Sequence, residues 1–258
     1  MGAIIRAIDT LSLDKDRVAI VSGIGCTARM PVYMDFNTMH TTHGRALAFA
    51  TGLALARPDM TVITVMGDGD ALAIGGNHFI HAARRNMGIT AVIVNNQIYG
   101  MTGGQVSPTT PAGKRASTAP FGNIDKPFPV ADLAVAAGAA FFARSTGYHS
   151  HELERYVRIG IETPGFAVIE AISHCHTTYG RLNKLGGAVE MMRYIKSNSI
   201  TQRAAEKLPP EETSDKFVRG IFHHDTDRPD YYTLYRDILE EAGGLDLADQ
   251  RINGIVSA

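Results

Sequence analysis

The sequence predicts an α/β fold in which a mostly parallel sheet carries helices on both faces. Short apolar runs alternate with longer helical patterns up to residue 172. Each apolar run is about six residues long and almost unbroken, which is typical of a strand covered on both faces. Alternating strands and helices form parallel sheets because each crossover helix packs back onto the sheet.

The first strands and helices are predicted from local signals. Residues 44–56 (GRALAFATGLALA) form an apolar helical pattern that ends before Pro58, and Gly75 and Gly76 weaken the first turn of the next helix. The predicted elements are strand 17–22, helix 44–56, strand 61–66, helix 73–86 and strand 89–94.

A long loop precedes a second alternating stretch. Residues 103–129 are rich in Gly, Pro, Ser and Thr, and loops of this length in compact domains are often functional. The elements predicted after the loop are helix 130–137, strand 139–143, helix 150–162 and strand 166–172.

The sequence becomes more polar after about residue 183. Residues 184–258 are polar and predicted to be mostly helical, with helices over 188–196 and 231–241. They contain too few apolar side chains for a core of their own. We therefore expect an α/β domain over residues 1–183 and a C-terminal helical arm over 184–258, which packs on that domain or on a partner subunit.

Composition excludes several functional classes. The formal net charge is −1 and charged residues make up 20% of the chain, so nothing indicates a nucleic acid or an anionic membrane as a partner. No apolar run reaches the ~18 residues of a membrane span, and we expect no signal peptide. Only two cysteines occur, Cys26 and Cys175. This usage argues for a reducing, cytoplasmic location without disulfides.

Three predicted strands end in glycine-rich or polar clusters. These clusters are Gly23–Thr27, Gly67–Asp70 and Asn95–Gln97. Ligands of open parallel sheets bind at the carboxyl ends of the strands. The Asp68 carboxylate, the Asn96 amide oxygen and a backbone carbonyl form a hard oxygen set suited to Mg²⁺, which completes its shell with phosphate oxygens and water. Glycines and a helix start beside Asp68 favour a diphosphate, the alternative being two ordinary turns.

The same segments resemble a known family. Gly67-Asp68-Gly69, followed after 25 residues by Asn95-Asn96, resembles the thiamine-diphosphate fingerprint. The segments SGIGCTAR, HTTHGRALAFATG, GDGDALAIGGNHFIHAARRN, NNQIYGMTGGQVSPTTP and AVEMMRY together resemble the β subunit of 2-oxoacid:ferredoxin oxidoreductases, most like the 2-oxoglutarate type. The resemblance covers essentially the whole chain and implies the diphosphate half of the thiamine-diphosphate-binding fold.

The resemblance also implies residue roles. Asp68, Asn96 and the main-chain carbonyl of Ile98 would hold Mg²⁺. Asp70 would shape the loop or position the cofactor. Apart from the resemblance, Arg29 follows the Cys26 turn, and its guanidinium is a candidate contact for a distal substrate carboxylate, with a solvated surface arginine as an equal alternative. The residues expected to line the cofactor are Ile24, Gly25, Cys26, Thr27, His43, Gly67, Gly69, Asp70, Asn95, Gly100 and Met101.

The implied reaction is oxidative decarboxylation of 2-oxoglutarate with coenzyme A to succinyl-CoA and CO2, with electrons passed through iron–sulfur to ferredoxin, or the reverse reductive carboxylation. Pyruvate, branched-chain and aryl 2-oxoacids stay open as substrates. The chain has room for only one α/β half. An α subunit is therefore expected to supply the activating glutamate and the parts that bind the pyrimidine, the 2-oxoacid and coenzyme A. The expected assembly is an αβ dimer or (αβ)2, inactive without the α subunit.

The cysteines pose a problem for the expected [4Fe-4S] cluster. Cys26 and Cys175 match two of the family's four cluster cysteines, but the family's Cys-x-x-Cys is missing, and two thiolates cannot close a four-cysteine site. Because MGAIIRAI resembles the helix that follows this pair in relatives, we expect the pair upstream of Met1. The alternatives are a cluster that is lost or otherwise ligated, or two inert small side chains.

Other readings of the sequence compete with this one. A Zn²⁺ site at His40 and His43, or at His78 and His81, lacks an obvious third ligand. The chain is alternatively the diphosphate-binding subunit of a non-oxidative thiamine-dependent decarboxylase, of the sulfopyruvate or acetolactate type. A binding or regulatory module that has lost catalysis is a third reading, and the intact Asp68, Asn95 and Asn96 argue against it.

Overall fold

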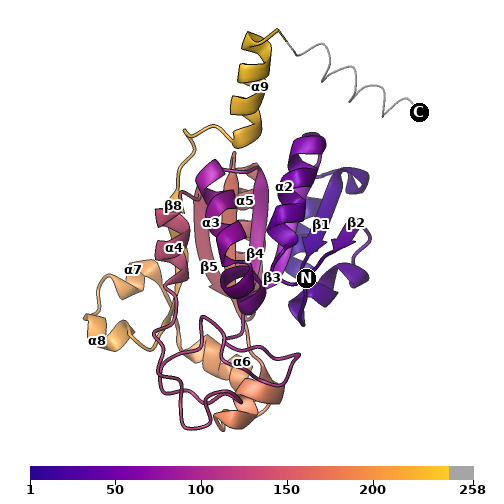
Figure 1. Ribbon diagram of the computed structural model, residues 1–258. Helices are drawn as coiled ribbons and strands as arrows, with labels where there is room; N and C mark the ends of the chain where they lie inside the picture. Colours follow the sequence, from indigo (N-terminus) through magenta and orange to yellow (C-terminus); the bar gives the residue numbers. More distant parts are fainter. Residues whose placement is uncertain (244–258) are drawn as a thin grey trace.

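The centre of the fold is one mixed sheet. In the computed structural model, which describes residues 1–243, eight strands lie in the order β2-β1-β3-β4-β6-β5-β8-β7 (Figure 1). The strands are β1 Val18–Ser22, β2 Asn37–His40, β3 Thr61–Gly67, β4 Ile89–Asn95, β5 Phe141–Thr146, β6 Phe166–Ile172, β7 Ser199–Thr201 and β8 Phe217–His224.

The first six strands all run parallel, from β2 at the edge to β5. Strand β8 pairs antiparallel to β5, and β7 pairs parallel to β8. Strands β1 and β6 are buried along their whole length, as expected for strands covered on both faces. The predicted fold class is therefore confirmed.

Helices cover both faces of the sheet. The longer helices are α1 Gly2–Thr10, α2 Ala46–Ala56, α3 Gly76–Arg85, α4 Val130–Ala136, α5 Ser150–Glu162, α6 Ala188–Ser197 and α9 Tyr231–Glu241. The short ones are 3-10 turns η1 Lys15–Arg17 and η2 Thr27–Tyr33, π turns η3 Asp70–Ile74 and η4 His176–Gly180, and α7 Gln202–Ala205 and α8 Pro210–Thr213.

Two hydrophobic cores lie on opposite faces of the sheet. Successive strand residues point to opposite sides, so Ile63 joins the core under α1 and α5, while its neighbour Val62 joins the core under α2, α3 and α4. Helix α1 packs against α5, and Arg6 Nε lies 2.7 Å from Glu154 Oε2. Burial on both faces explains why the sequence shows continuous apolar runs rather than alternation.

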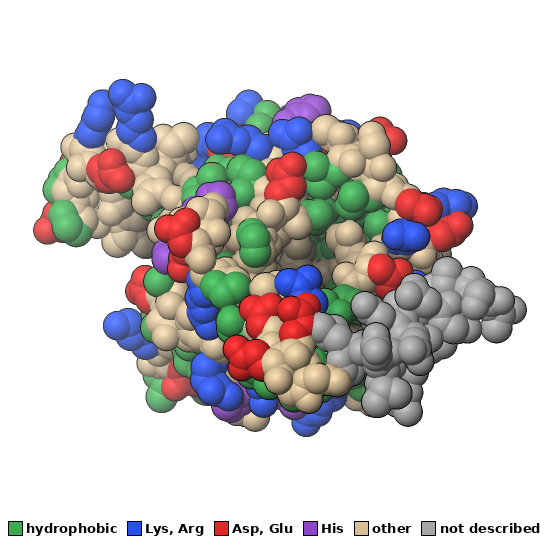
Figure 2. Space-filling model, turned by 90° about the horizontal axis from the view of Figure 1, so that it is seen from above, with side chains coloured by type: hydrophobic (Ala, Val, Ile, Leu, Met, Phe, Trp, Pro, Cys, Tyr) green, Lys and Arg blue, Asp and Glu red, His purple; other side chains and the backbone are tan. Residues whose placement is uncertain are grey.

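The two ends of the sheet differ. The loop 103–129 and α6 lie at the carboxyl ends of the strands, whereas α9 extends away from the opposite end (Figure 1). Seen from the α9 end, acidic, basic and hydrophobic side chains are interspersed on the surface (Figure 2). Within the described part of the chain, there is no helix with the length and apolarity that crossing a membrane requires.

The prediction of a mostly helical C-terminal arm is wrong for residues 199–224. These residues form β7 and β8 with α7 and α8 between them, and β8 extends the sheet of the main domain. Seven of its eight residues are only half-buried, so the strand lacks the apolar run by which central strands are recognised. Helices α6 and α9 lie where they were predicted, and residues 244–258 of the expected arm lie outside the described residues.

Other boundaries shift for local reasons. Strand β5 starts at Phe141 and continues through Arg144 to Thr146, beyond the apolar run predicted as strand 139–143. Arg144 is accommodated because it pairs with Glu170 of β6. Strand β2 was missed because it is a short edge strand whose four residues are all exposed.

Candidate active site

The expected cofactor residues converge on one pocket at the carboxyl ends of β1, β3 and β4. Its volume is about 160 Å³. It is lined by Ile24, Gly25, Cys26, Thr27, His43, Gly67, Asp68, Gly69, Asp70, Asn96, Ile98, Tyr99, Gly100, Met101 and Thr102. This set contains all three expected Mg²⁺ ligands and every expected cofactor residue except Asn95, which lies behind the pocket wall. The parallel register of β1, β3 and β4 brings these segments together.

Asp68 presents a buried carboxylate to this pocket. Its side chain is only 2% exposed. Oδ2 accepts a hydrogen bond from the Thr109 hydroxyl at 2.7 Å, while Oδ1 has only a long contact of 3.4 Å from the backbone N–H of Asn96. Burial raises the pKa of Asp68, and the nearby Ser107 and Thr109 hydroxyls oppose that effect. A buried carboxylate without a cation is costly, and a bound cation removes that cost.

The turn after β4 supplies the other two expected ligands. Asn95 Oδ1 accepts from Gln97 N at 3.1 Å, and Asn96 Oδ1 accepts from Ile98 N at 3.2 Å. Each asparagine thus bonds the backbone two residues ahead. Gln97 has a φ of 63°, a left-handed conformation that is uncommon outside glycine. The turn places Asn96 and Ile98 on the pocket while Asn95 faces the interior.

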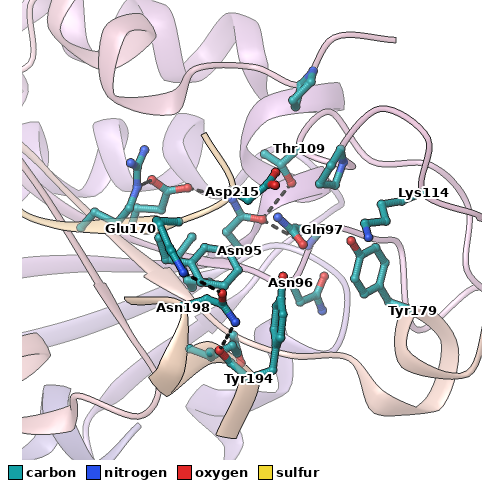
Figure 3. Close-up of a pocket in the computed structure, with 18 of the residues that line it drawn as sticks. Asn95, Asn96, Gln97, Thr109, Lys114, Glu170, Tyr179, Tyr194, Asn198 and Asp215 are labelled. Atoms are coloured by element: carbon teal, nitrogen blue, oxygen red, sulfur yellow. Dashed lines mark hydrogen bonds and ion pairs between the residues drawn. The ribbon is translucent and has the colours of Figure 1, made fainter. Parts of the chain in front are cut away.

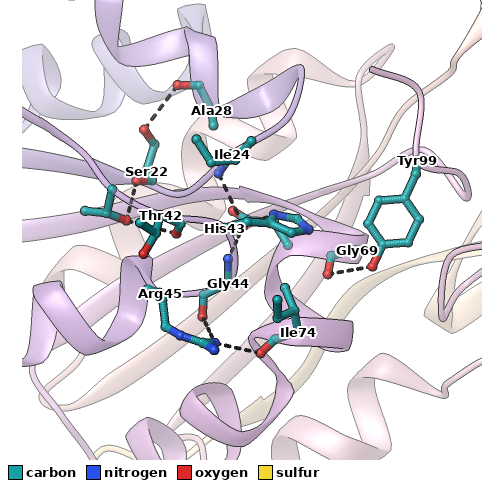
Figure 4. A network of polar contacts seen from close by, with 12 residues as sticks. Ser22, Ile24, Ala28, Thr42, His43, Gly44, Arg45, Gly69, Ile74 and Tyr99 are labelled. Carbon is teal, nitrogen blue, oxygen red and sulfur yellow. Dashed lines mark hydrogen bonds and ion pairs between the residues drawn. The ribbon is translucent and has the colours of Figure 1, made fainter. Parts of the chain in front are cut away.

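Asp70 serves a different purpose from Asp68. Its Oδ1 accepts hydrogen bonds from Gly44 N at 2.6 Å, His43 Nδ1 at 2.8 Å and Ile24 N at 3.3 Å (Figure 4). These bonds tie the loop after β1 to the segment that opens α2. Burial raises the pKa of Asp70, and the backbone donors and His43 oppose it. Its Oδ2 is buried without a hydrogen-bond partner among the described residues. Asp70 therefore shapes the pocket wall.

Two glycines make this close packing possible. A Cβ on Gly23 would lie 2.2 Å from Asp70 Oδ2, and a Cβ on Gly69 would lie 2.2 Å from the Tyr99 ring. The Tyr99 hydroxyl also donates to the Gly69 carbonyl at 3.2 Å. Tyr99 was not among the predicted site residues. Its place in NNQIYG, next to the ligand turn, is the only signal that the sequence offered.

The two cysteines approach the same point from distant parts of the chain. A Cβ on Gly100 would lie 3.1 Å from the Cys175 sulfur and 3.7 Å from the Cys26 sulfur. Cys26 is exposed and Cys175 is buried. Burial raises the pKa of Cys175, but hydrogen bonds from Thr177, Thr178 and nearby backbone groups outweigh it, so that the pKa is lowered overall. A lowered pKa favours the thiolate, the form that binds metals.

Two sequence hypotheses concern residues away from this arrangement. Arg29 lies exposed on η2 and does not line the pocket, so its contact with substrate stays a prediction. In residues 1–243 there is no group of three or more His, Cys, Asp or Glu side chains able to hold a metal. The zinc alternative therefore has no third ligand there, and His43 bonds to Asp70 instead.

A second, larger cavity lies on the other side of the Asn95–Ile98 turn (Figure 3). Its volume is about 540 Å³, and its walls come from the loop 103–129, strands β5 and β6, helix α6 and residues 214–217. Glu170 and Arg144 line it, and Thr109 reaches from it to Asp68. Sequence reasoning missed these three residues. A single carboxylate in the apolar run FAVIEAI was the available signal for Glu170.

The residues of the smaller pocket fit Mg²⁺ and a diphosphate. The donors are a carboxylate oxygen, an amide oxygen and a backbone carbonyl, all hard oxygens. Asp68 has an oxygen with no short hydrogen bond, and the glycines keep the adjoining backbone accessible.

Comparison with known proteins identifies the family of this chain. The family described as thiamine pyrophosphate enzyme, C-terminal TPP binding domain, matches residues 23–171. A 2-oxoglutarate synthase subunit KorB from Methanothermobacter marburgensis is 46% identical over 96% of this chain and 87% of the relative. Another from Methanocaldococcus jannaschii is 46% identical over 93% of this chain and 89% of the relative. The chain belongs to the β-subunit family of the 2-oxoacid:ferredoxin oxidoreductases.

A solved member of this family has the same fold. The 2-oxoglutarate:ferredoxin oxidoreductase from Magnetococcus marinus, with 2-oxoglutarate, coenzyme A and succinyl-CoA bound, superposes with a TM-score of 0.83 at 32% identity, over 99% of this chain and 87% of that one. The predicted family and enzyme class are confirmed. The matched domain identifies thiamine diphosphate as the cofactor, and membership of a β-subunit family implies an α subunit as partner.

Proposed function

We propose that this β subunit, together with its α subunit, oxidatively decarboxylates 2-oxoglutarate with coenzyme A to succinyl-CoA and CO2 and passes the electrons to ferredoxin, or runs the reverse carboxylation. The names of the relatives and the ligands of the solved neighbour support this substrate pair. The observation that carries the proposal is the convergence of Asp68, Asn96 and Ile98 with two glycine-rich loops on one pocket.

The residues of this pocket have distinct tasks. Asp68 Oδ1, the Asn96 amide oxygen and the Ile98 carbonyl would hold Mg²⁺, with the diphosphate beside Gly69, Gly100 and Met101. Bound thiamine diphosphate supplies the electron sink that makes loss of CO2 from the keto carbon possible. Asp70 and His43 fix the loops around it, and the Tyr99 ring closes one wall against water. Ile24 to Thr27 line the side that comes from β1.

The iron–sulfur part of the proposal is narrower. We propose Cys26 and Cys175 as two thiolate ligands of a [4Fe-4S] cluster, supported by the approach of both sulfurs to Gly100. The sequence holds only these two cysteines, so two further ligands are needed from elsewhere.

The α subunit would complete the active site. No glutamate lines the pocket within the described residues, so the activating glutamate is assigned to the α subunit, in an αβ or (αβ)2 assembly. Exposed hydrophobic side chains at the pocket mouth, Ile24 and Met101, suit a protein interface. Arg29 is the candidate contact to the distal carboxylate of 2-oxoglutarate.

The test is made on the αβ complex purified anaerobically. We expect ferredoxin or viologen reduction that depends on both 2-oxoglutarate and coenzyme A, with little reduction from pyruvate, and iron and thiamine diphosphate in the same sample. Decarboxylation without reduction of the acceptor, in a sample without iron, would instead establish a non-oxidative decarboxylase. Equal rates with pyruvate would overturn the substrate assignment, and activity of the isolated β subunit would overturn the shared site.

A further inference from the structure

Glu170 is a buried carboxylate that the proposed reaction does not use. It lies in the apolar strand β6, is 1% exposed, and lines the larger cavity rather than the cofactor pocket. Oε2 accepts from Arg144 Nε at 2.6 Å, and Oε1 accepts from Asn95 Nδ2 at 2.7 Å. A buried carboxylate in an apolar strand is costly unless both oxygens are paired, so its partners indicate its purpose.

Glu170 determines which way the Asn95 amide points. A carboxylate only accepts hydrogen bonds, so the amide must turn its NH2 group toward Glu170. Its oxygen then faces the backbone N–H of Gln97 at 3.1 Å and the Thr109 hydroxyl at 2.8 Å (Figure 3). The opposite orientation would set the Asn95 oxygen against the carboxylate and its NH2 group against the N–H of Gln97.

The Asn95 amide reaches the cation site along two routes. One is the bond to Gln97 N, which supports a residue held in the left-handed conformation and thereby the turn that presents Asn96 and Ile98. The other is Thr109, whose single hydroxyl proton is shared between Asn95 Oδ1 at 2.8 Å and Asp68 Oδ2 at 2.7 Å. Asn95 and Thr109 are both only 4% exposed, so bulk solvent has little access to these contacts.

We propose that Glu170 is a positioning residue for the cation site, acting through the orientation of the Asn95 amide. This inference rests on the proposed function, because the cation site is the one assigned there. The competing explanation is structural, with the Arg144–Glu170 ion pair merely joining β5 to β6. Arg144 is also packed against Phe142 and Phe222, with its guanidinium carbon 5.8 and 5.1 Å from the ring centroids.

The substitution Glu170→Gln separates the two explanations because Arg144 fixes the orientation of the introduced amide. Arg144 only donates, so the oxygen of the introduced glutamine must face it and the NH2 group must face Asn95. The Asn95 amide is then forced to turn over. Adding Asn95→Asp restores the pattern with donor and acceptor exchanged, because the introduced aspartate accepts from both the glutamine NH2 group and the backbone N–H of Gln97.

The measurement is Mn²⁺ binding to the oxidised αβ complex depleted of divalent cations, with thiamine diphosphate present, from the room-temperature EPR signal of free Mn²⁺. We expect E170Q to raise the Kd for Mn²⁺ about tenfold, the lower end for loss of an outer-shell partner, and the E170Q/N95D double variant to return within about threefold of wild type. N95D alone sets two carboxylates against each other and should weaken binding despite its extra charge. R144Q keeps the Glu170–Asn95 bond and should change the Kd less than threefold.

Each outcome decides between explanations. Equal Kd values for E170Q and wild type would overturn the positioning role, as would an R144Q variant as weak as E170Q or a double variant without recovery. If E170Q fails to assemble, the double variant still tests the inference through its recovered affinity. A wild-type complex that binds no Mn²⁺ with thiamine diphosphate would instead overturn the proposed cation site itself, and the inference with it.

Discussion

The two cavities on either side of the Asn95–Ile98 turn are built in different ways. The cofactor pocket is lined by the loops that directly follow β1, β3 and β4, together with His43 from the segment between β2 and α2. The larger cavity is formed by side chains from the long loop, β5, β6, α6 and residues 214–217. The first can bind a ligand whose groups match backbone donors and oxygens. In the second cavity, Glu170 contacts Asn95 and Thr109 contacts Asp68, beside the first pocket, and the segments that line it are distant from one another in sequence.

The largest effect is expected from the cation ligand of the first cavity. Asp68→Asn removes the carboxylate expected to hold Mg²⁺, and we expect at least about 100-fold weaker retention of thiamine diphosphate, beyond what loss of an outer-shell partner causes. Because burial disfavours the charged carboxylate, the cofactor-free complex should melt at the same temperature or higher. Cofactor content and Tm of the same preparation test this, and retained cofactor would place the cation elsewhere.

An apolar wall residue of the second cavity should show the opposite pattern. Ile195 of α6 is 3% exposed and lines the larger cavity only. Ile195→Ala should cost about 3 kcal/mol of stability, since large-to-alanine changes in cores cost about 2–5 kcal/mol, while the cofactor affinity stays within about twofold. Denaturant unfolding of the complex measures the first, and titration with thiamine diphosphate the second. A loss of cofactor affinity without loss of stability would erase the distinction between the cavities.

A third change tests whether the cofactor pocket depends on glycine. Gly23→Ala places a Cβ 2.2 Å from Asp70 Oδ2, whose partner oxygen is held by three donors. We expect a loss of about 2 kcal/mol, in the range for overpacking, together with weaker cofactor binding.

The matched control is Gly52→Ala in α2, where a Cβ would have no neighbour within 4 Å. Alanine is about 0.5–1 kcal/mol better than glycine inside a helix, so this variant should be more stable than wild type. If Gly23→Ala and Gly52→Ala change stability and cofactor binding in the same way, then close packing against Asp70 is not the reason for glycine at position 23.

The difference between the two cavities also explains which site residues could be predicted from the sequence. Asp68 and Asn96 were predictable because each follows a buried strand directly, and parallel strands bring their carboxyl ends together. Glu170, Thr109 and Arg144 were not, since their roles depend on pairs such as Asn95 with Glu170, 75 positions apart. Strand β8 was not predicted for a related reason. It is only half-buried, and its place is set by pairing with β5 rather than by its own pattern.

The smallest effect is expected in the loop 103–129, which contributes to the wall of the larger cavity. Phe121 is 98% exposed although it is a large hydrophobic residue. Because its side chain buries almost no surface within this chain, Phe121→Ser should change stability by less than about 0.5 kcal/mol, as for surface substitutions in general. Both the Kd for thiamine diphosphate and the unfolding midpoint should match wild type within error. If the αβ complex instead dissociates more readily while the β subunit stays folded, the loop is a contact with the α subunit. The outer side of the larger cavity would then be an interface, and the difference between the two cavities would extend from how they are built to which protein completes them.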